Sequence, residues 1–333
     1  MRAMLLHKPG DANHSPLTLS EVPMPEPGEG QVRVRVSVCG VCRTDLHVVE
    51  GDLPLPGLPI VPGHQVVGRV DAIGAGCSQL KPGDRVGIAW LRETDGVCEY
   101  CRQGRENLCV SSRYTGYHED GGYAEFALVP EAFAYPLPDR LDDSHVAPLL
   151  CAGIIGYRAL NRAALPEGGS LLLVGFGSSA AIVLPIALHR GFRVMVVTRT
   201  PSHQAMALDQ GALWAGDAFD RIPEKVDSAI LFAPSGRLVP PTLEALKPGG
   251  TLSIAGIHLT DIPTLIYEKH LFYEKQVTSV TSNTRRDGRD LLNEANAIGL
   301  TPRVRLYDLA DANRALQDVK HSRVDGTAVL TMS

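Results

Sequence analysis

The sequence predicts a two-domain α/β protein that combines a β-rich region with a doubly wound parallel sheet. A chain of 333 residues, 44% of them hydrophobic, exceeds the length at which a single core usually divides. Residues 1–151 contain short apolar runs punctuated by Pro and Gly, which is typical of irregular β structure. Residues 153–287 instead alternate apolar runs of five or six residues with helix-length segments, which is the pattern of a parallel sheet covered on both faces. Two amphipathic segments and a closing strand follow.

The charge and cysteine content narrow the class of protein. A formal net charge of −5 provides no basic surplus for nucleic acid. The N-terminus lacks the apolar core of a signal peptide, and glycines and Pro185 interrupt the most apolar stretch, so we expect no membrane partner and a cytoplasmic location. Seven cysteines, an odd number, suit reduced thiols and metal binding better than a disulfide framework.

The first cysteine motif is SVCGVCRTDLH, which places Cys39 and Cys42 in a C-x-x-C. Valines alternate with polar residues from Gln31 to Val38, so the motif lies where a half-buried strand ends. A redox disulfide would require C-x-x-C at a helix start within a compact βαβ unit. Metal ligation is therefore our first interpretation and redox chemistry the second.

A second cluster, DGVCEYCRQGRENLC, has the spacing of a tetrahedral metal site. Three cysteines fall within twelve residues, and an aspartate precedes the first of them by three. Zinc accepts a carboxylate oxygen in place of a thiolate, so this combination is chemically reasonable. The alternative is a lobe with free thiols and no metal. The four candidate ligands are Asp95, Cys98, Cys101 and Cys109.

Three further candidates are dispersed along the chain, namely Cys42, His64 and Cys151. Each is weak by itself, because a His after Pro-Gly is often a turn residue and a Cys in an apolar run is often a packing residue. Two thiolates and an imidazole with an open fourth position are nevertheless the composition of a catalytic zinc site.

The segment SLLLVGFGSSA places Gly175, Gly177 and Ala180 as G-x-G-x-x-A between a strand and a helix. Dinucleotide binding needs a tight turn at the first position, close backbone approach to pyrophosphate at the second, and a small packing residue at the third. After the next strand the chain has Thr198 and Arg199 where NAD-binding proteins usually have an acid. Arginine can pair with a 2′-phosphate, so we favour NADP(H) over NAD(H).

The order of these motifs resembles that of the zinc-dependent alcohol dehydrogenases of the medium-chain dehydrogenase/reductase superfamily, over nearly the whole chain. The similar segments are CGVCRTDLH, PGHQVVG, KPGDRVGIAWL, CEYCRQGRENLC, CAGIIGYRAL and VGFGSSA. GIAWL, before the cysteine lobe, is similar to the yeast and bacterial branch. The resemblance implies a GroES-like catalytic domain (1–152 and 288–333), a Rossmann domain (153–287), an active site between them, and a homotetramer, with a dimer as the alternative.

The resemblance also assigns roles to individual residues. It implies a catalytic zinc held by Cys42, His64 and Cys151, with Asp45 supporting His64 and Cys39 as a packing residue. It implies a structural zinc held by Asp95, Cys98, Cys101 and Cys109. Arg43 would face the cofactor pyrophosphate, and Trp90 would line the substrate pocket. The chain departs from the family at Gln65, where Glu is common, and at Asp95, where Cys is usual.

The expected reaction is hydride transfer between an alcohol and NAD(P)+. Zinc would lower the pKa of the bound alcohol. Thr44 would then accept its proton and pass it, through a ribose hydroxyl, to His47, since histidine is the side chain that titrates near neutral pH. Without the resemblance, Thr44 and His47 would be interpreted as a capped turn and a surface residue.

Two other functions are considered. A thiol–disulfide oxidoreductase would use Cys39 and Cys42 and would lose activity when Cys39 is replaced. A non-enzymatic dinucleotide-binding protein would have no catalytic zinc, and the intact set of Cys42, His64 and Cys151 argues against that alternative.

Overall fold

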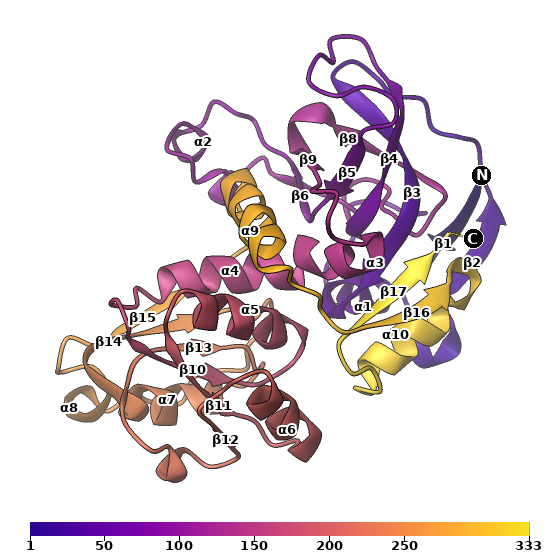
Figure 1. Cartoon of the computed structure of the whole chain (residues 1–333). Helices are drawn as coiled ribbons and strands as arrows, with labels where there is room; N and C mark the ends of the chain where they lie inside the picture. The colour runs from indigo at the N-terminus through magenta and orange to yellow at the C-terminus, as the bar shows by residue number, and fades with distance from the viewer. Residues whose placement is uncertain (333) are drawn as a thin grey trace. The chain divides into compact units, whose positions relative to one another are not determined.

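The computed structural model describes residues 1–332 and divides into two compact units. Unit 1 combines Met1–Cys151 with the C-terminal segment that begins at Ser282, and unit 2 is Ala152–Thr281. Figure 1 shows both units, with the yellow end of the C-terminal segment beside the indigo strands of unit 1.

Unit 1 is built around a seven-stranded sheet with the order β16-β17-β3-β4-β5-β9, in which β8 also pairs with β3. Two small antiparallel pairs, β1-β2 and β6-β7, accompany it. The strands are β1 (Arg2–Leu6), β2 (Leu17–Glu21), β3 (Gln31–Val41), β4 (Gln65–Ile73), β5 (Arg85–Ile88), β6 (Leu91–Glu93), β7 (Arg113–Tyr114), β8 (Phe126–Pro130), β9 (Ala134–Pro136), β16 (Val304–Asp308) and β17 (Thr327–Thr331). The helices are α1 (Arg43–Glu50), α2 (Glu99–Arg102), α3 (Asp143–Val146), α9 (Arg285–Ile298) and α10 (Ala312–Lys320).

Strand β3 is the centre of this sheet and leads directly to the first cysteine motif. Its valines at 32, 34, 36 and 38 are buried, whereas the residues between them are partly or fully exposed, as the alternation predicts. The strand pairs with β4, β8 and β17, so its inward face lies within the core of unit 1. This pairing places the end of β3, and therefore Cys42, beside the start of β4.

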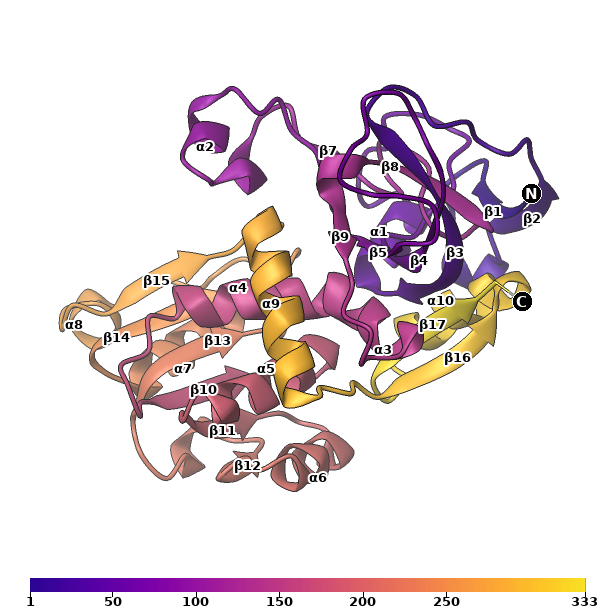
Figure 2. The ribbon, with the colours of Figure 1, turned by 45° about the horizontal axis from the view of Figure 1, so that its top comes forward.

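Unit 2 contains one six-stranded sheet with the order β12-β11-β10-β13-β14-β15, and every pairing in it is parallel. In Figure 2 these strands lie side by side in one twisted sheet. The strands are β10 (Ser170–Val174), β11 (Arg193–Val197), β12 (Trp214–Gly216), β13 (Val226–Leu231), β14 (Leu246–Ile254) and β15 (Gln276–Ser279), and the helices are α4 (Ala152–Arg162), α5 (Ser178–His189), α6 (Pro201–Asp209), α7 (Val239–Ala245) and α8 (Tyr267–His270).

This strand order is that of a Rossmann fold, so the predicted fold class is confirmed. Every residue of β10 is buried, as expected for a central strand covered on both faces. The strand order reverses between β10 and β13, because β11 and β12 lie on one side of β10 and the later strands lie on the other. Ligands of such sheets bind at this switch point. Helix α5 follows β10 and continues through Pro185.

The amphipathic segments predicted near the C-terminus form α9 and α10, and the closing strand is β17. Helix α9 begins with a capping box between Thr284 and Asp287 and ends at Gly299 in the left-handed conformation. None of the helices described for residues 1–332 has the length and hydrophobicity needed to cross a membrane.

Candidate metal and dinucleotide sites

Cys42 is the N-cap of α1, directly after β3. Its sulfur accepts a hydrogen bond from Thr44 N at 3.3 Å, and its backbone N–H donates to Asp45 Oδ2 at 2.8 Å. These two bonds form a capping box, in which Cys42 and Asp45 occupy the positions where Ser and Glu are usual. The position of the Cys42 sulfur is therefore set by the start of the helix.

His64 lies immediately before β4 and is 1% exposed. The preceding Gly63 has a φ of 98°, a conformation that favours glycine, and a side chain there would overlap the ring of Tyr123. Pro62 and Gly63 thus form a tight turn that leads His64 into the interior beside the end of β3.

Cys151 ends the 3₁₀ helix η4 (Ala147–Leu150) and completes a cluster with Cys42 and His64. The Cys42 sulfur lies 3.5 Å from His64 Nε2 and 3.9 Å from the Cys151 sulfur. A tetrahedral zinc ion with ordinary bond lengths separates two sulfur ligands by about 3.8 Å, and a sulfur and a nitrogen ligand by about 3.6 Å. The donor atoms and their spacing therefore fit zinc, with a fourth position left for another ligand.

The tautomer of His64 is set by Asp45, which is 1% exposed. Oδ1 of Asp45 lies 2.8 Å from His64 Nδ1, so Nδ1–H donates to the carboxylate and Nε2 faces the two sulfurs. Burial alone would lower the pKa of His64, but the charges of Asp45 and Cys42 raise it to about 10. The neighbouring Cys151 thiol and burial raise the pKa of Cys42 well above its usual value. A divalent cation would relieve this accumulation of negative charge.

Gln65, the residue that replaces the family's Glu, is completely buried. Among the described residues neither its amide oxygen nor its amide nitrogen has a hydrogen-bond partner. It lies opposite Gly40 on β3, and a side chain at Gly40 would come within 2.9 Å of its Cδ. The glycine makes room for an amide, which keeps this position beside the cluster uncharged.

Thr44 and His47 lie one turn apart on α1. Thr44 is 9% exposed and is next to Cys42 through its backbone hydrogen bond. The side chain of His47 is 24% exposed, and its Nδ1 lies 2.7 Å from Asp52 Oδ2. Arg43, the first residue of the helix, is exposed and donates to Ser322 Oγ at 3.2 Å.

Trp90, the residue predicted to line the substrate pocket, is half-buried between β5 and β6. Its ring meets the ring of His64 edge-on, with centroids 5.0 Å apart. Trp90 is thus in direct contact with one of the three candidate metal ligands.

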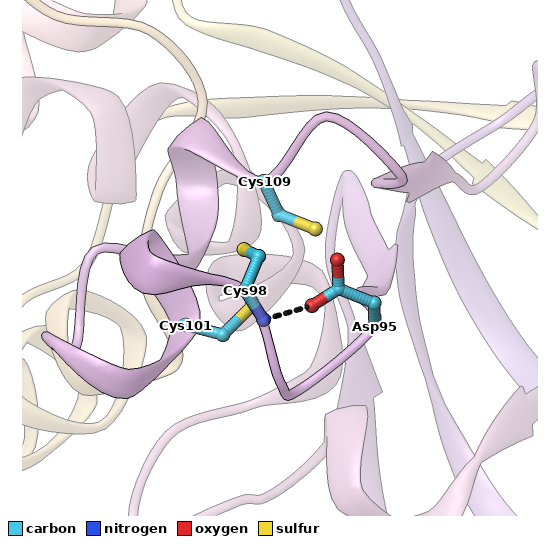
Figure 3. A group of neighbouring side chains, drawn as sticks. All are labelled: Asp95, Cys98, Cys101 and Cys109. Carbon is cyan, nitrogen blue, oxygen red and sulfur yellow. Dashed lines mark hydrogen bonds between the residues drawn. The ribbon is translucent and has the colours of Figure 1, made fainter.

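The second cluster consists of Asp95, Cys98, Cys101 and Cys109, whose ligand atoms all lie within 4.8 Å of one another. Figure 3 shows the four side chains turned toward a common centre, with the Cys98 N–H donating to Asp95. Asp95 Oδ1 accepts from the backbone N–H groups of Val97 and Cys98, both at 2.9 Å. Asp95 thus supplies a carboxylate oxygen that lies within 4.8 Å of the three sulfurs, in the place of a fourth thiolate.

The backbone hydrogen bonds from Cys98 and Val97 hold the pKa of Asp95 well below its usual range, so this ligand is ionised. Burial of the Cys101 thiol, and its hydrogen bonds with Cys98 and Asp95, raise its pKa to about 11. A hydrogen bond with Thr94 lowers this pKa but is outweighed. Three sulfurs and one carboxylate oxygen are a donor set that suits zinc.

An ion pair between Glu106 and Arg285 connects this metal lobe to α9, and the Glu106 side chain is the buried partner. Glu106 lies on the short helix η2 (Glu106–Leu108), immediately before the ligand Cys109, and its side chain is 8% exposed. Its Oε1 accepts from the backbone N–H of Arg285 at 3.0 Å and from the Arg285 Nε at 3.3 Å. The lobe and the N-terminus of α9 are therefore held by the same carboxylate.

In unit 2 the fingerprint residues occupy the turn from β10 to α5. Gly175 has a φ of 88°, and a side chain there would come within 2.9 Å of the backbone of Ala233. Gly177 is the N-cap of α5, and a side chain on it would meet no described atom within 4 Å. Packing thus explains the first glycine but not the second, which fits close approach of a bound pyrophosphate. Ala180 is completely buried in α5.

Thr198 and Arg199 follow β11, at the carboxyl end of the sheet. Thr198 is 7% exposed, and its backbone bonds to Gly216 and to the side chain of Gln204. Arg199 is exposed. A guanidinium in this place suits a ribose that carries a 2′-phosphate.

Sequence reasoning missed several neighbours of the predicted site residues. Asp52 contacts His47, and the only signal for it was an acid just beyond the helix end at Gly51. Tyr114 and Tyr117 contact Trp90, yet they are more than twenty residues away in the chain. Their proximity depends on the pairing of β6 with β7.

Comparisons with known proteins show which proteins the chain is similar to. The alcohol dehydrogenase GroES-like domain family matches residues 28–139. A Mycobacterium tuberculosis protein named "Probable alcohol dehydrogenase AdhA" is 53% identical over 99% of this chain and 97% of its own. An alcohol dehydrogenase of Geobacillus stearothermophilus is 35% identical over 95% of this chain and 96% of its own.

Solved structures share the fold. A thermostable alcohol dehydrogenase from Pyrobaculum aerophilum superposes with a TM-score of 0.90 at 25% identity, covering 99% of both chains. Other structures of this fold contain NAD, NADP(H), or cobalt and zinc.

A GroES-like unit with a Cys–His–Cys cluster, joined to a dinucleotide-type parallel sheet, defines the class of metal-dependent dehydrogenases. The chain belongs to the zinc-dependent alcohol dehydrogenases of the medium-chain dehydrogenase/reductase superfamily.

Proposed function

We propose that this protein is a zinc-dependent alcohol dehydrogenase and aldehyde reductase that transfers hydride between a primary or secondary alcohol and NADP+ or NAD+. The observation that carries this proposal is the cluster of Cys42, His64 and Cys151, whose spacing fits three ligands of one tetrahedral zinc ion. In the reaction the alcohol carbon gives up a hydride and its oxygen a proton, and the products are a carbonyl compound and NAD(P)H.

A zinc ion at this cluster would supply Lewis acidity toward the substrate oxygen. The chain's own residues prepare the ligands for it. Asp45 keeps the proton of His64 on Nδ1, and the N-terminus of α1 positions the Cys42 sulfur. Gln65 adds no further negative charge, so Asp45 is the carboxylate that acts on the ligand shell.

Two residues of α1 would carry the proton. Thr44 Oγ1 receives the proton that the alcohol loses, because this residue is adjacent to the ligand Cys42. His47 lies one turn further along the helix and exchanges a proton with solvent, to which its side chain is partly exposed. Asp52 orients the His47 ring through the 2.7 Å contact at Nδ1.

The second cluster would hold a structural zinc ion through Asp95, Cys98, Cys101 and Cys109. Four protein ligands leave no position for substrate, which is the usual arrangement of a structural site. The lobe it stabilises includes α2 and η2.

The dinucleotide would bind at the carboxyl edge of the unit 2 sheet. Gly175, Gly177 and Ala180 provide the turn and the helix N-terminus for the pyrophosphate. Arg199 supports a preference for NADP(H), and the exposed Arg43 is proposed to contribute a charge for the pyrophosphate. We propose residues 1–152 and 288–333 as the catalytic domain and 153–287 as the cofactor domain; the two compact units divide a few residues earlier, after Cys151 and before Ser282.

We also propose that the protein forms a homo-oligomer, with a tetramer favoured over a dimer. Strand β15 is the last strand of its sheet, and its free edge could pair with a second copy. Exposed apolar side chains accompany it: Ile266, Tyr267, Phe272, Tyr273 and Val277. Seven free cysteines agree with a reducing, cytoplasmic location.

The test is oxidation of NADH and NADPH with a panel of small aldehydes, using protein purified without chelator. We expect turnover with a lower KM for NADPH. Replacing Cys42 by Ser should abolish turnover and remove the catalytic metal. Arg199→Asp should shift the preference toward NADH, because an acid repels the 2′-phosphate.

Cys39→Ala is the matched control. Cys39 is buried in β3 and its sulfur contacts Gly40 O at 3.6 Å, so its loss should leave turnover intact. Loss of turnover in Cys39→Ala protein that still binds metal would favour thiol–disulfide chemistry. Absence of turnover from metal-loaded wild-type protein with every aldehyde would refute the proposal.

A further inference from the structure

One strand, β5, contacts both ends of the helical segment that leads to the candidate ligand Cys151. The segment consists of α3 and η4, which follow one another directly from Asp143 to Leu150. Arg85 is the first residue of β5, and Gly87 lies two residues further along the strand. Arg85 holds the beginning of the segment, and Gly87 packs against its end.

The guanidinium of Arg85 is bonded to three groups around the beginning of the segment. Its Nε donates to Asp143 Oδ1 at 2.7 Å, and its Nη1 and Nη2 donate to Pro138 O at 2.5 Å and to Leu141 O at 2.6 Å. Arg85 and Asp143 thus also form an ion pair, in which the Arg85 side chain is 8% exposed. A guanidinium presents five N–H donors in a fixed plane, so it holds the three acceptors in one arrangement.

Leu150, the last residue of η4, packs against the backbone of β5. A side chain at Gly87 would come within 2.9 Å of both methyl carbons of Leu150, which is completely buried. It would also come within 3.1 Å of Leu137 Cδ2. Leu150 can therefore lie this close to the strand only because residue 87 has no side chain. Cys151 is the next residue, so this contact limits where its backbone can lie.

The sheet that holds this segment also places the other two candidate ligands. Strand β5 pairs with β4, which begins directly after His64, and β4 pairs with β3, which ends directly before Cys42. In this pairing Gly87 is opposite Val67, which follows His64 closely in the chain. The spacing of the donor atoms of Cys42, His64 and Cys151 is therefore set by neighbouring strands of one sheet.

We propose that Arg85 and Gly87 are positioning residues for Cys151, and that they set the zinc affinity of the Cys42–His64–Cys151 cluster. The inference rests on the proposed function, because it takes this cluster as the catalytic metal site. Zinc–sulfur bonds are about 2.3 Å long, and a metal site tolerates deviations of about 0.2 Å. A change at either contact should displace one end of the α3–η4 segment, and a shift of Cys151 beyond this tolerance weakens its bond to zinc.

The test measures how well zinc protects individual cysteines of the zinc-loaded protein. Chelator is added at increasing concentrations, free thiols are alkylated with iodoacetamide, and mass spectrometry gives the alkylated fraction of each cysteine. Arg85→Met should lower the chelator concentration that half-exposes Cys42 and Cys151 by about tenfold, as the loss of a group that supports a metal ligand does. Cys98 and Cys101 of the metal lobe are the internal reference and should respond as they do in the wild type.

Arg69→Met is the matched control. Arg69 lies opposite Arg85 in the pairing of β4 with β5, and it donates to Gly83 O at 3.0 Å in an exposed hydrogen bond. Its replacement should therefore leave the zinc protection of both sites unchanged. Arg85→Lys should restore only part of the protection, because a lysine can keep the ion pair with Asp143 but cannot make all three bonds in the same plane.

Gly87→Ala tests the other end of the segment. The added methyl group should displace Leu150 and lower the zinc protection of Cys151 by about tenfold. The double variant Gly87→Ala/Leu150→Val should recover most of this protection, because valine lacks the two Cδ carbons that the alanine would overlap. A general loss of stability would not be reversed in this way, since Leu150→Val itself removes buried volume.

The outcomes separate this inference from the function on which it rests. Unchanged zinc protection of Cys151 in Arg85→Met would overturn the positioning role and leave the dehydrogenase proposal standing. Equal weakening of the cluster and of the metal lobe would also overturn it, because Arg85 would then only stabilise unit 1. If zinc protects neither Cys42 nor Cys151 in the wild type, both proposals fail.

Discussion

Asp45 holds His64 and Cys42 at the same time, with one carboxylate oxygen for each. Oδ1 bonds to His64 Nδ1 and Oδ2 accepts from the Cys42 N–H, both at 2.8 Å. The residue is 1% exposed, so these bonds are protected from solvent. One side chain thus closes the N-terminus of α1 and aligns two of the three candidate ligands of the catalytic metal.

Asp45→Asn should therefore weaken metal binding more than it weakens the fold. The amide of asparagine has one acceptor oxygen, so it can accept from only one of the two donors. We therefore expect zinc affinity to fall about 10- to 100-fold, as it does when a carboxylate that supports a metal ligand is lost. The impaired helix cap should lower the free energy of unfolding by about 1 kcal/mol. Chelator competition measures the affinity and urea unfolding the stability. Asp71→Asn, which removes a carboxylate paired with Arg33 and Arg35, is the control. An unchanged zinc affinity in Asp45→Asn would contradict this role.

The ion pair between Glu106 and Arg285 should couple the metal lobe to α9. Removing the lobe metal should increase hydrogen exchange at residues 284–289, because Glu106 no longer holds the Arg285 N–H in place. Glu106→Gln should show the raised exchange already and respond little to chelator. Helix α10 is the internal control. Equal exchange of the α9 N-terminus with and without metal would show that the lobe and the helix are independent.

His47→Gln should slow turnover mainly below neutral pH. Glutamine cannot accept a proton and release it to solvent, so we expect a loss of about tenfold or more at acidic pH and a smaller one at alkaline pH. Asp52→Asn should change the profile in the same direction but less, since the imidazole of His47 remains and loses only the contact that orients it. A pH–rate profile of His47→Gln identical to that of the wild type would exclude the relay.

Asp227 should stabilise unit 2 above pH 4 and cease to do so near pH 2. Burial raises its pKa, but hydrogen bonds from Lys247 and from Ser170 outweigh burial and lower the pKa to about 2. A carboxyl group with a depressed folded pKa contributes stability above its unfolded pKa and loses it as the pH falls through the folded value, and this gap corresponds to about 2 kcal/mol.

We therefore expect Asp227→Asn to lower the free energy of unfolding by about 2 kcal/mol at pH 7 and by little near pH 2. Urea unfolding in a Trp90→Phe background measures it, because Trp214 emission then reports on unit 2. A destabilisation of the same size at both pH values would show that the ion pair and hydrogen bonds are not its source.

Val277→Lys on the edge strand β15 should dissociate the proposed oligomer. A lysine on a free sheet edge opposes pairing with a second copy. Light scattering after size exclusion should show a smaller particle than the wild type. Leu208→Lys on α6, also an exposed apolar residue of unit 2, should leave the mass unchanged. A wild-type protein that is already monomeric would contradict the oligomer directly.

The local patterns in the sequence were sufficient for a β-rich unit followed by a parallel α/β sheet, whereas the GroES-like domain was predicted only by the resemblance to a family. Alternation of valines predicted β3, and strand-length apolar runs with Gly175 and Gly177 predicted the parallel sheet. The Asp95 lobe could also be predicted, because its four ligands lie within fifteen consecutive residues and spacing alone brings them together.

The catalytic cluster could not be predicted from spacing, because His64 and Cys151 reach Cys42 only through the β3–β4 pairing and the turn at η4. Resemblance to a family suggested these three residues, and the structure brings them together. Neither source predicted the stacking of Tyr114 on Trp90, which depends on the register of β6 and β7 across the metal lobe.

The most direct test of the central claim is the zinc content per chain, measured by mass spectrometry of protein purified without chelator, for the wild type and for Cys42→Ser and Asp95→Ala. We predict two zinc ions in the wild type and one in each variant, with turnover retained in Asp95→Ala and lost in Cys42→Ser. A wild-type protein without zinc, or one whose turnover survives loss of the Cys42 metal, would contradict the assignment of Cys42, His64 and Cys151 as the catalytic site.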